Sequence, residues 1–191
     1  MAHVVTEQSH LALHACFQNP YLREIRMSTA NSKPEPRVTF APITPNNLGT
    51  VRKLNSVLFP IKYSEKFYSD ILLPEVEEFC QLVYYNDIPV GNVCCRQETQ
   101  DGKNVLYLMT MGVLAPYRSR KLGSRSLEHV LTAAASQTKP KVDKIYLHVQ
   151  VSNDDAKRFY ERHGFKEVSI HKDYYKKIEP HDAWVLEKDF S

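Results

Sequence analysis

The apolar residues of this chain follow two different periods from residue 37 onward. Residues 48–58 carry leucine or valine every three or four positions, which favours an amphipathic helix, whereas 145–150 alternates apolar and polar residues, which favours a strand. The predicted strands are 38–43, 79–85, 90–97, 104–114, 144–151, 165–171 and 183–188, and the predicted helices are 48–58, 65–72, 123–136 and 153–163. Strands that alternate with helices in the second half indicate an α/β fold with a mixed sheet.

Turn and capping residues set the expected ends of these elements. The stretch 44–47 combines capping residues with an early proline and predicts the start of a helix. Asn153 predicts another helix start, Gly164 would end that helix, and the stretch 86–89 is a turn signal between two strands. Gly112 lies inside a strand-like run, where glycine predicts a bulge or the close approach of another backbone.

Residues 1–36 differ from the rest and are expected to form a flexible N-terminal extension. Their apolar positions have no clear period, and the last third is polar and contains prolines. His10 and His14 lie four residues apart near Cys16, but a chance spacing explains them, and we assign no metal. Residues 37–191 are expected to form one domain.

Composition narrows the class of protein. The chain of 191 residues is 42% hydrophobic and 25% charged with a net charge of +3, which is typical of a globular domain and does not indicate a nucleic-acid partner. It has no apolar run long enough for a membrane helix and no leader-like segment, so we expect no membrane association. The four cysteines lack C-x-x-C spacing, which favours free thiols in a reducing compartment.

A basic loop precedes the predicted helix 123–136. Four cations, Arg118, Arg120, Lys121 and Arg125, fall within eight residues there. Free N–H groups and the positive end of the helix dipole attract anions to a helix N-terminus, especially phosphates. A basic surface loop without a ligand explains the same residues equally well.

The segment 153–165 (NDDAKRFYERHGF) follows the next predicted strand. Taken alone, the cap, the packing face and the terminal glycine of this segment are explained by its place in the fold and indicate no function. In this order and spacing, however, the basic loop and this segment resemble the GNAT acetyltransferase superfamily. The strand–loop–helix of that superfamily binds the pyrophosphate of CoA through Gln or Arg, two residues, Gly, one residue, then Gly or Ala. Arg118 and Gly123 match the ends of this pattern, but Lys121 replaces its first glycine.

The resemblance implies how acetyl-CoA is held. The fold would be a mixed central sheet flanked by helices, with splayed strands that hold acetyl-CoA. Backbone groups of Met111, Val113 and Leu114 would pair with the pantetheine arm like an added strand, and Asn153 would contact the cofactor while capping its helix. The other cofactor-binding residues that it implies are Arg118, Ser119, Arg120, Lys121, Leu122, Gly123, Ser124 and Tyr160.

Six further segments narrow the resemblance. Residues 59–63, 84–88, 91–96, 107–110, 145–150 and 174–180 are together similar to the NatE class of N-terminal acetyltransferases, and the similarity spans 37–191. That class implies acetylation of protein or peptide N-termini, preferably a retained methionine followed by an apolar residue. It also names NatA subunits and the ribosome as candidate partners, and a cytoplasmic location with the nucleus as a second one.

Two side chains on neighbouring predicted strands are candidates for freeing the amine. Alternation places His148 on the polar face of its strand, where a histidine is usually structural. Imidazole is also the side chain best matched to proton removal near neutral pH. The resemblance implies that His148 and Tyr107 deprotonate the amine through ordered water, and that Tyr160 protonates the departing thiolate. Packing beside Phe159 is the alternative role of Tyr160.

Residues 59–63 and 174–180 are two proline-containing segments rich in aromatic residues, and they suggest a substrate pocket. An apolar core would have the same composition. The resemblance implies that this pocket holds an apolar first residue. The substrate-binding residues that it implies are Phe59, Pro60, Ile61, Tyr63, Arg96, Met109, Tyr174, Tyr175 and Ile178. Two alternatives stay open: a lysine Nε-acetyltransferase, and a weakly active binding subunit of a NatA/NatE complex, which the Lys121 substitution favours.

Overall fold

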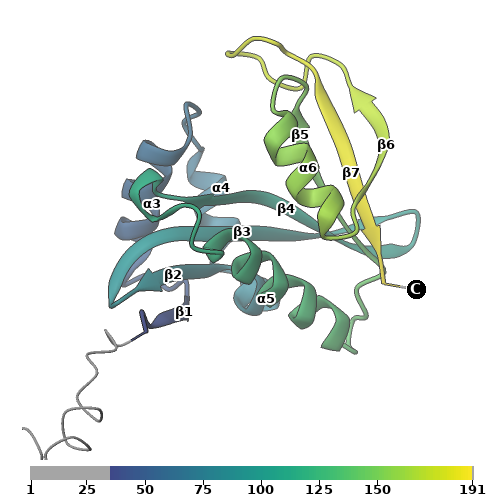
Figure 1. Ribbon diagram of the computed structural model, residues 1–191. Helices are drawn as coiled ribbons and strands as arrows, with labels where there is room; N and C mark the ends of the chain where they lie inside the picture. Colours follow the sequence, from purple (N-terminus) through teal and green to yellow (C-terminus); the bar gives the residue numbers. More distant parts are fainter. Residues whose placement is uncertain (1–34, 191) are drawn as a thin grey trace, which may run out of the picture. The chain divides into compact units, whose positions relative to one another are not determined.

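The computed structural model describes residues 35–190, so the expectations for the N-terminal extension lie outside the described residues. The described strands form one seven-stranded sheet in the order β1-β2-β3-β4-β5-β7-β6 (Figure 1). The strands are β1 (Val38–Pro42), β2 (Gln81–Tyr85), β3 (Ile88–Gln100), β4 (Lys103–Val113), β5 (Lys144–Gln150), β6 (Lys166–His171) and β7 (Ala183–Asp189). The α-helices are α3 (Leu48–Leu58), α4 (Glu65–Asp70), α5 (Leu122–Ser136) and α6 (Asp154–Arg162).

Helices cover both faces of the sheet around β3 and β4. Three consecutive residues of β3, Val93, Cys94 and Cys95, have no exposed surface. Because consecutive strand residues point to opposite faces, both faces must be covered at this point. In Figure 1, α5 lies in front of the part of the sheet formed by β2, β3 and β4, and α6 lies in front of β5. The predicted α/β fold with a mixed sheet flanked by helices is therefore confirmed.

The strands β4 and β5 are the one parallel pair of this sheet, and they pair over a short distance only. Val105, Leu106 and Tyr107 of β4 face Lys144, Ile145 and Tyr146 of β5, and neither strand pairs with the other beyond that point. The register of β4 against β3 shifts here, because Cys94 faces Thr110 while Cys95 faces Leu108. Met109 is thus an extra residue on β4. A bulge of this kind bends the strand and increases its twist, which turns β4 away from β5.

A buried amide network ties α3 to the bent part of β4. The Asn92 side chain on β3 donates to Oδ1 of Asn55 on α3 over 2.9 Å, and Thr110 on β4 donates to Oδ1 of Asn92 over 3.5 Å. All three residues are buried. The carbonyl of Asn55 also accepts the N–H of Phe59, which ends the helix. Hydrogen-bonded amides inside a core fix the relative positions of the elements that carry them.

Several predicted boundaries are wrong for identifiable reasons. A 3-10 helix, Pro74–Phe79, occupies the start of the strand predicted at 79–85, because acidic residues follow its first proline and favour a helical turn. The turn predicted over 86–89 needs only Asn86 and Asp87, both with positive φ, so Ile88 already belongs to β3. Asn47 does not cap α3 with its side chain; its Oδ1 instead accepts the N–H of Thr44.

Other sequence predictions are confirmed. Oδ1 of Asn153 accepts the N–H of Ala156 and caps α6, and Gly164 follows that helix with a φ of 86°. At Gly112, however, the close approach is made by side chains and not by the predicted backbone, because a Cβ there would lie 3.0 Å from the side chains of Leu58 and Phe59. No helix in the described part of the chain is long and apolar enough to cross a membrane.

The contact between Gly91 of β3 and β4 yields a stability prediction. A Cβ at Gly91 would lie 2.4 Å from the carbonyl oxygen of Gly112, and that backbone can yield only if the two strands separate. We expect Gly91→Ala to lower the free energy of unfolding by about 2 kcal/mol or more, measured by urea denaturation. Gly49→Ala is the matched control: it has open space around it in α3, so it should raise stability by about 0.5 kcal/mol. Equal stability of both variants would contradict the close packing of β3 and β4.

Candidate active site

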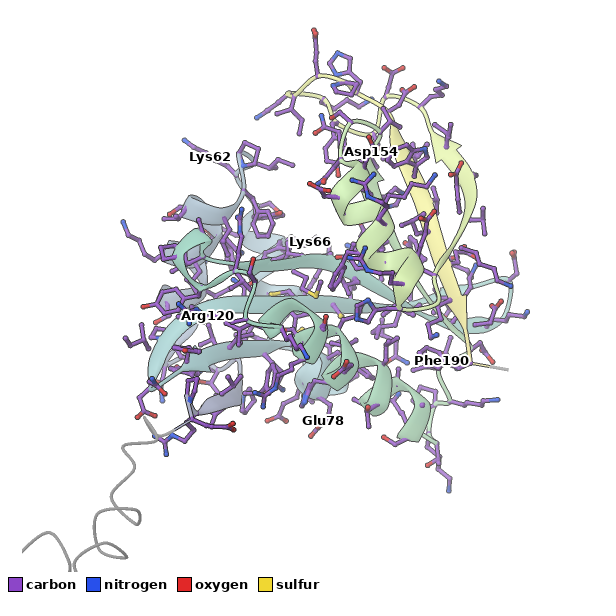
Figure 2. All side chains as sticks on the ribbon, in the orientation of Figure 1. Lys62, Lys66, Glu78, Arg120, Asp154 and Phe190 are labelled. Carbon is purple, nitrogen blue, oxygen red and sulfur yellow. The ribbon has the colours of Figure 1, made fainter. Side chains whose placement is uncertain are left out.

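A groove of about 1240 Å³ opens where β4 and β5 part. Its walls come from the two strands, the start of α5, one face of α6 and the loops that follow α3 and β6. In Figure 2, Lys62 marks the loop after α3 and Asp154 marks the start of α6, on opposite sides of this opening. The predicted residues that line it are Phe59, Pro60, Ile61, Tyr63, Tyr107, Met109, Met111, Val113, Arg118, Ser119, Lys121, Leu122, Gly123, Ser124, His148, Asn153, Tyr160, Tyr174, Tyr175 and Ile178.

Three predicted site residues lie outside the groove lining. The guanidinium of Arg120 donates to the Tyr85 hydroxyl over 3.2 Å and lies over that ring. Both backbone groups of Leu114 are already bonded, its N–H to Val90 and its carbonyl to Tyr117. Arg96 is set back behind Tyr107, with its guanidinium carbon 5.5 Å from that ring centroid.

One end of the groove is suited to an anion. The first N–H groups of α5, at Leu122, Gly123 and Ser124, have no side-chain cap and the first turn holds no acidic residue. Such free N–H groups at the positive end of a helix dipole bind phosphate well. Lys121 immediately precedes them with a φ of 60°. This left-handed conformation costs a non-glycine residue about 1 kcal/mol. Lysine in place of the family's first glycine therefore strains the backbone, in addition to limiting how closely a phosphate can approach.

A second group of cations, which was not predicted from the sequence, lies at the same end of the groove. Arg158 and Arg162 of α6 line the groove, and Arg158 pairs with Asp155 over 2.6 Å. Together with Phe159, these residues repeat at intervals of three and four, which places them on one face of a helix. That spacing was visible in the sequence. These residues line a groove, however, only because α6 lies beside α5, and the spacing does not predict that position. Gly123 faces it, since a Cβ there would lie 3.8 Å from the Phe159 ring.

The middle of the groove holds a cluster of aromatic rings. Tyr107 and Tyr146 face each other across the last paired position of β4 and β5, and their rings stack with centroids 4.7 Å apart. His148 lies two residues further along β5, 5.5 Å from the Tyr107 ring in an edge contact. Tyr174 from the loop after β6 stacks on His148 at 4.0 Å, and its hydroxyl is hydrogen-bonded to the Tyr107 hydroxyl. The structure therefore brings the two predicted catalytic residues together.

Burial sets the protonation states in this cluster. Burial, together with the nearby His171, lowers the pKa of His148 to about 4, so the imidazole is neutral at pH 7 and can accept a proton. Burial raises the pKa of the Tyr107 phenol well above its usual value, and the neighbouring Tyr174 adds to this. It likewise raises the pKa of Tyr160, which lies against the groove from α6. Both tyrosines keep their protons and act as donors.

A charged pair supports the cluster from behind. Glu98 of β3 pairs with Arg96 and accepts the hydroxyl of Tyr146 over 2.8 Å. Arg96 also lies 3.8 Å from the buried carboxylate of Asp70. Because Tyr146 stacks on Tyr107, the Glu98 carboxylate holds the stack in place from the side away from the groove. The predicted role of Arg96 in the substrate wall is thus one of support, exerted through Tyr107.

The mouth of the groove is lined by aromatic residues on two sides. On the side of α3, Tyr63 makes an edge contact with Phe59 at 6.0 Å and stacks on Phe67 at 4.4 Å. On the opposite side, Tyr174 and Tyr175 pack edge to face at 4.7 Å. The loop after β6 is held by hydrogen bonds, including two between Tyr175 and His181. Other lining residues that the sequence did not single out are Leu58, Lys62, Phe67, Leu108, Thr110, Gly112, Leu147, Val149, Gln150, Ala156, Lys176 and Lys177.

Comparison with known proteins places the chain in a family. A family model described as the acetyltransferase (GNAT) family matches residues 48–165. The chain is 46% identical over 152 residues to the N-alpha-acetyltransferase 50 of Danio rerio, covering 80% of this chain and 88% of the relative. It is 45% identical over 146 residues to the probable N-acetyltransferase san of Drosophila melanogaster, covering 76% and 77%.

A solved structure shows the same similarity in both fold and sequence. Arabidopsis thaliana Naa50, in complex with the bisubstrate analogue CoA-Ac-MVNAL, superposes with a TM-score of 0.73 at 42% identity, over 80% of this chain and 98% of that one. The chain therefore belongs to the GNAT acetyltransferase family. Within that family, its similarity is to the N-alpha-acetyltransferase 50 proteins and to san.

The conformation of Lys121 yields a prediction about acetyl-CoA binding. Lys121→Ala keeps the strained backbone and removes the ammonium, so we expect acetyl-CoA to bind about three- to ten-fold more weakly by isothermal titration calorimetry. Lys121→Gly removes the strain and lets the backbone approach a phosphate, so it should recover the affinity and raise the melting temperature relative to Lys121→Ala. Lys53→Ala, an exposed cation of α3 outside the groove, is the control. Equal affinities of the two Lys121 variants would show that only the charge matters.

Proposed function

We propose that this protein transfers the acetyl group of acetyl-CoA to the α-amine of protein N-termini, preferably a retained methionine followed by an apolar residue. The observation that carries this proposal is the position of His148 and Tyr107. They lie in the middle of a groove whose one end offers cations and free helix N–H groups and whose other end is lined by aromatic rings. A two-ended groove of this kind brings a phosphate-bearing donor and an apolar acceptor to one point.

The residues at the anion end fit the phosphates of acetyl-CoA. The N–H groups of Leu122, Gly123 and Ser124 would face the pyrophosphate, and Lys121 and Arg158 would add positive charge. Acetyl-CoA, when bound, supplies the acetyl group as a reactive thioester. No cluster of three or more His, Cys, Asp or Glu side chains that could hold a metal is found within residues 35–190.

The basicity of the site suits an α-amine better than a lysine. The attacking amine must be neutral, and about 300 times more of a peptide α-amine than of a lysine side chain is neutral at pH 7, from pKa values of about 7.8 and 10.4. His148, with its pKa lowered to about 4, is a weak base. A weak base is sufficient for an amine that is already partly neutral, whereas a lysine would need a stronger one.

Different side chains of the groove would transfer protons, orient the amine and enclose the substrate. The neutral imidazole of His148 accepts the amine proton, directly or through water, and the Tyr107 hydroxyl orients the amine or that water. Tyr160 keeps its proton at neutral pH and can give it to the departing thiolate. Phe59 and Tyr63 on one side and Tyr175 on the other would enclose the first side chain of the substrate.

The relatives' names supply further support for the acceptor. One similar structure is a complex with an analogue that joins CoA to a peptide beginning with methionine and valine. The side chains that line the mouth of the groove here are apolar enough to take such a first residue. Association with NatA subunits and the ribosome, and a cytoplasmic location with the nucleus as a second one, stay predictions from the sequence.

A peptide panel tests the choice of acceptor. We expect a peptide beginning Met-Leu to be acetylated at its α-amine at least ten-fold more efficiently than one beginning Ser-Leu, because the aromatic mouth gains apolar contact only with the methionine side chain. An N-blocked peptide with an internal lysine should react more slowly still. Mass spectrometry of the products identifies the acetylated nitrogen. Preferential acetylation of the lysine would make the protein a lysine acetyltransferase, and acetyl-CoA binding without turnover would make it a binding subunit.

Variants of the two central residues test the mechanism. We expect His148→Ala to lower kcat/KM by about 100-fold and Tyr107→Phe by about ten-fold, because each removes a group that handles the amine proton. Acetyl-CoA affinity should not change, since neither residue lies at the anion end of the groove. Tyr117→Phe, a half-buried tyrosine outside the groove, is the control. Full turnover by both His148→Ala and Tyr107→Phe would refute their assigned roles.

A further inference from the structure

A second imidazole lies beside His148 on the side away from Tyr107. His171 is the last residue of β6, which pairs with β7, and β7 in turn pairs with β5. Its ring centroid is 5.3 Å from that of His148 and 5.3 Å from that of Tyr174. His171 is exposed to solvent, whereas His148 is half-buried. An exposed imidazole therefore adjoins the half-buried one at a separation that a single water molecule can bridge.

The inner imidazole is poorly suited to keep a proton. Burial and the neighbouring His171 lower the pKa of His148 to about 4, far below that of an α-amine. Its Nδ1 is buried and has no hydrogen-bond partner within the described part of the chain. No protein group therefore fixes its tautomer at that nitrogen. The titratable groups around it are Tyr107 of β4, Tyr146 of β5, Tyr174 of the loop after β6 and His171 of β6, and the charge of Glu98 on β3, which is paired with Arg96, also acts on it.

In each turnover that starts from the ammonium form of the α-amine, which is its main form at pH 7, the proposed reaction must release a proton from the groove. The substrate R–NH₃⁺ and acetyl-CoA become R–NH–acetyl, free CoA thiol and one H⁺: a C–N bond forms, the thioester C–S bond breaks, and the sulfur keeps one of the two protons that nitrogen loses. The remaining proton has to reach solvent. A base that binds it as weakly as His148 can only pass it on.

We propose that His171 acts through His148 as the outer imidazole of a proton path that carries this proton from the groove to solvent. The inference rests on the function proposed above and deepens it. The proton reaches His148 from the amine, moves to His171 directly or through one water, and leaves to bulk water or buffer. No redox step and no further reactant is needed.

The other neighbours of His148 are less suited to this role. The hydroxyl of Tyr174 is engaged with that of Tyr107. The carboxylate of Glu98 already accepts from Arg96, Tyr146 and Gln100, and these hydrogen bonds outweigh its burial and lower its pKa. Its partner Tyr146 uses its hydroxyl to donate to Glu98 and does not line the groove. Among the groups that face His148 in the described structure, His171 alone combines an imidazole with exposure to solvent.

Kinetics with added imidazole test the path. His171→Gln should lower kcat for the Met-Leu peptide at pH 7 about ten-fold and leave both KM values within two-fold, because substrate contacts are untouched. Adding imidazole to the assay should restore kcat in a concentration-dependent way, since a diffusible base replaces the missing one. Ile170→Gln places the same side chain on the adjacent exposed residue of β6 and should behave like the parent protein. Unchanged kcat, or a loss that imidazole does not restore, overturns the inference.

A titration that needs no turnover separates this inference from the proposed function. We would follow the His148 ring by ¹⁵N NMR in the apo protein and in His171→Gln. Removing the second imidazole should raise the titration midpoint of His148 by about half a pH unit, because a positive charge beside it is lost. An unchanged midpoint overturns the coupling of the two rings. If the midpoint moves but the parent protein acetylates no N-terminal peptide, the coupling stands and the proposed function fails.

Discussion

The parting of β4 and β5 is the constraint on which the rest of the site depends. These parallel strands pair over three positions only, and the extra residue Met109 bends β4 away just beyond them. Parallel strands that separate expose backbone groups and side chains that a continuous sheet would cover. The buried amides of Asn55, Asn92 and Thr110 hold the bent strand against α3. The fold thereby keeps the groove between the two strands open.

In the middle of the groove, burial decides which side chains can accept a proton and which can donate one. The same desolvation that lowers the pKa of His148 raises those of Tyr107 and Tyr160. The result is a site without a formal charge among these three groups at neutral pH: one acceptor and two donors. An uncharged site offers no counter-ion to a substrate ammonium, so the ammonium is favoured to lose its proton there. It also makes proton export a separate problem, because His148, the one acceptor among these three groups, binds a proton only weakly.

Sequence patterns predicted the features that depend on residues close together in the chain. Periodicity was sufficient for α3 and for the alternation of β5, in which Ile145, Leu147 and Val149 are buried, and a side-chain cap was sufficient for Asn153. The resemblance to GNAT enzymes supplied most of the groove lining. Neither source could find the bulge at Met109 or the contact of Arg120 with Tyr85, because each depends on strand register and on residues far apart in the sequence.

Lys121 shows how a departure from a family pattern can be understood physically. A glycine there would adopt the left-handed backbone without strain and let a phosphate approach the N–H groups of α5. Lysine keeps the same conformation at a cost of about 1 kcal/mol and places an ammonium at the end of the helix. A close, directional contact is thus replaced by a flexible point charge beside Arg118 and Arg158. Attraction between exposed charges is screened by salt, whereas hydrogen bonds from backbone N–H groups are much less so. Binding of acetyl-CoA to this chain should therefore depend more strongly on ionic strength than binding to a relative that keeps the glycine.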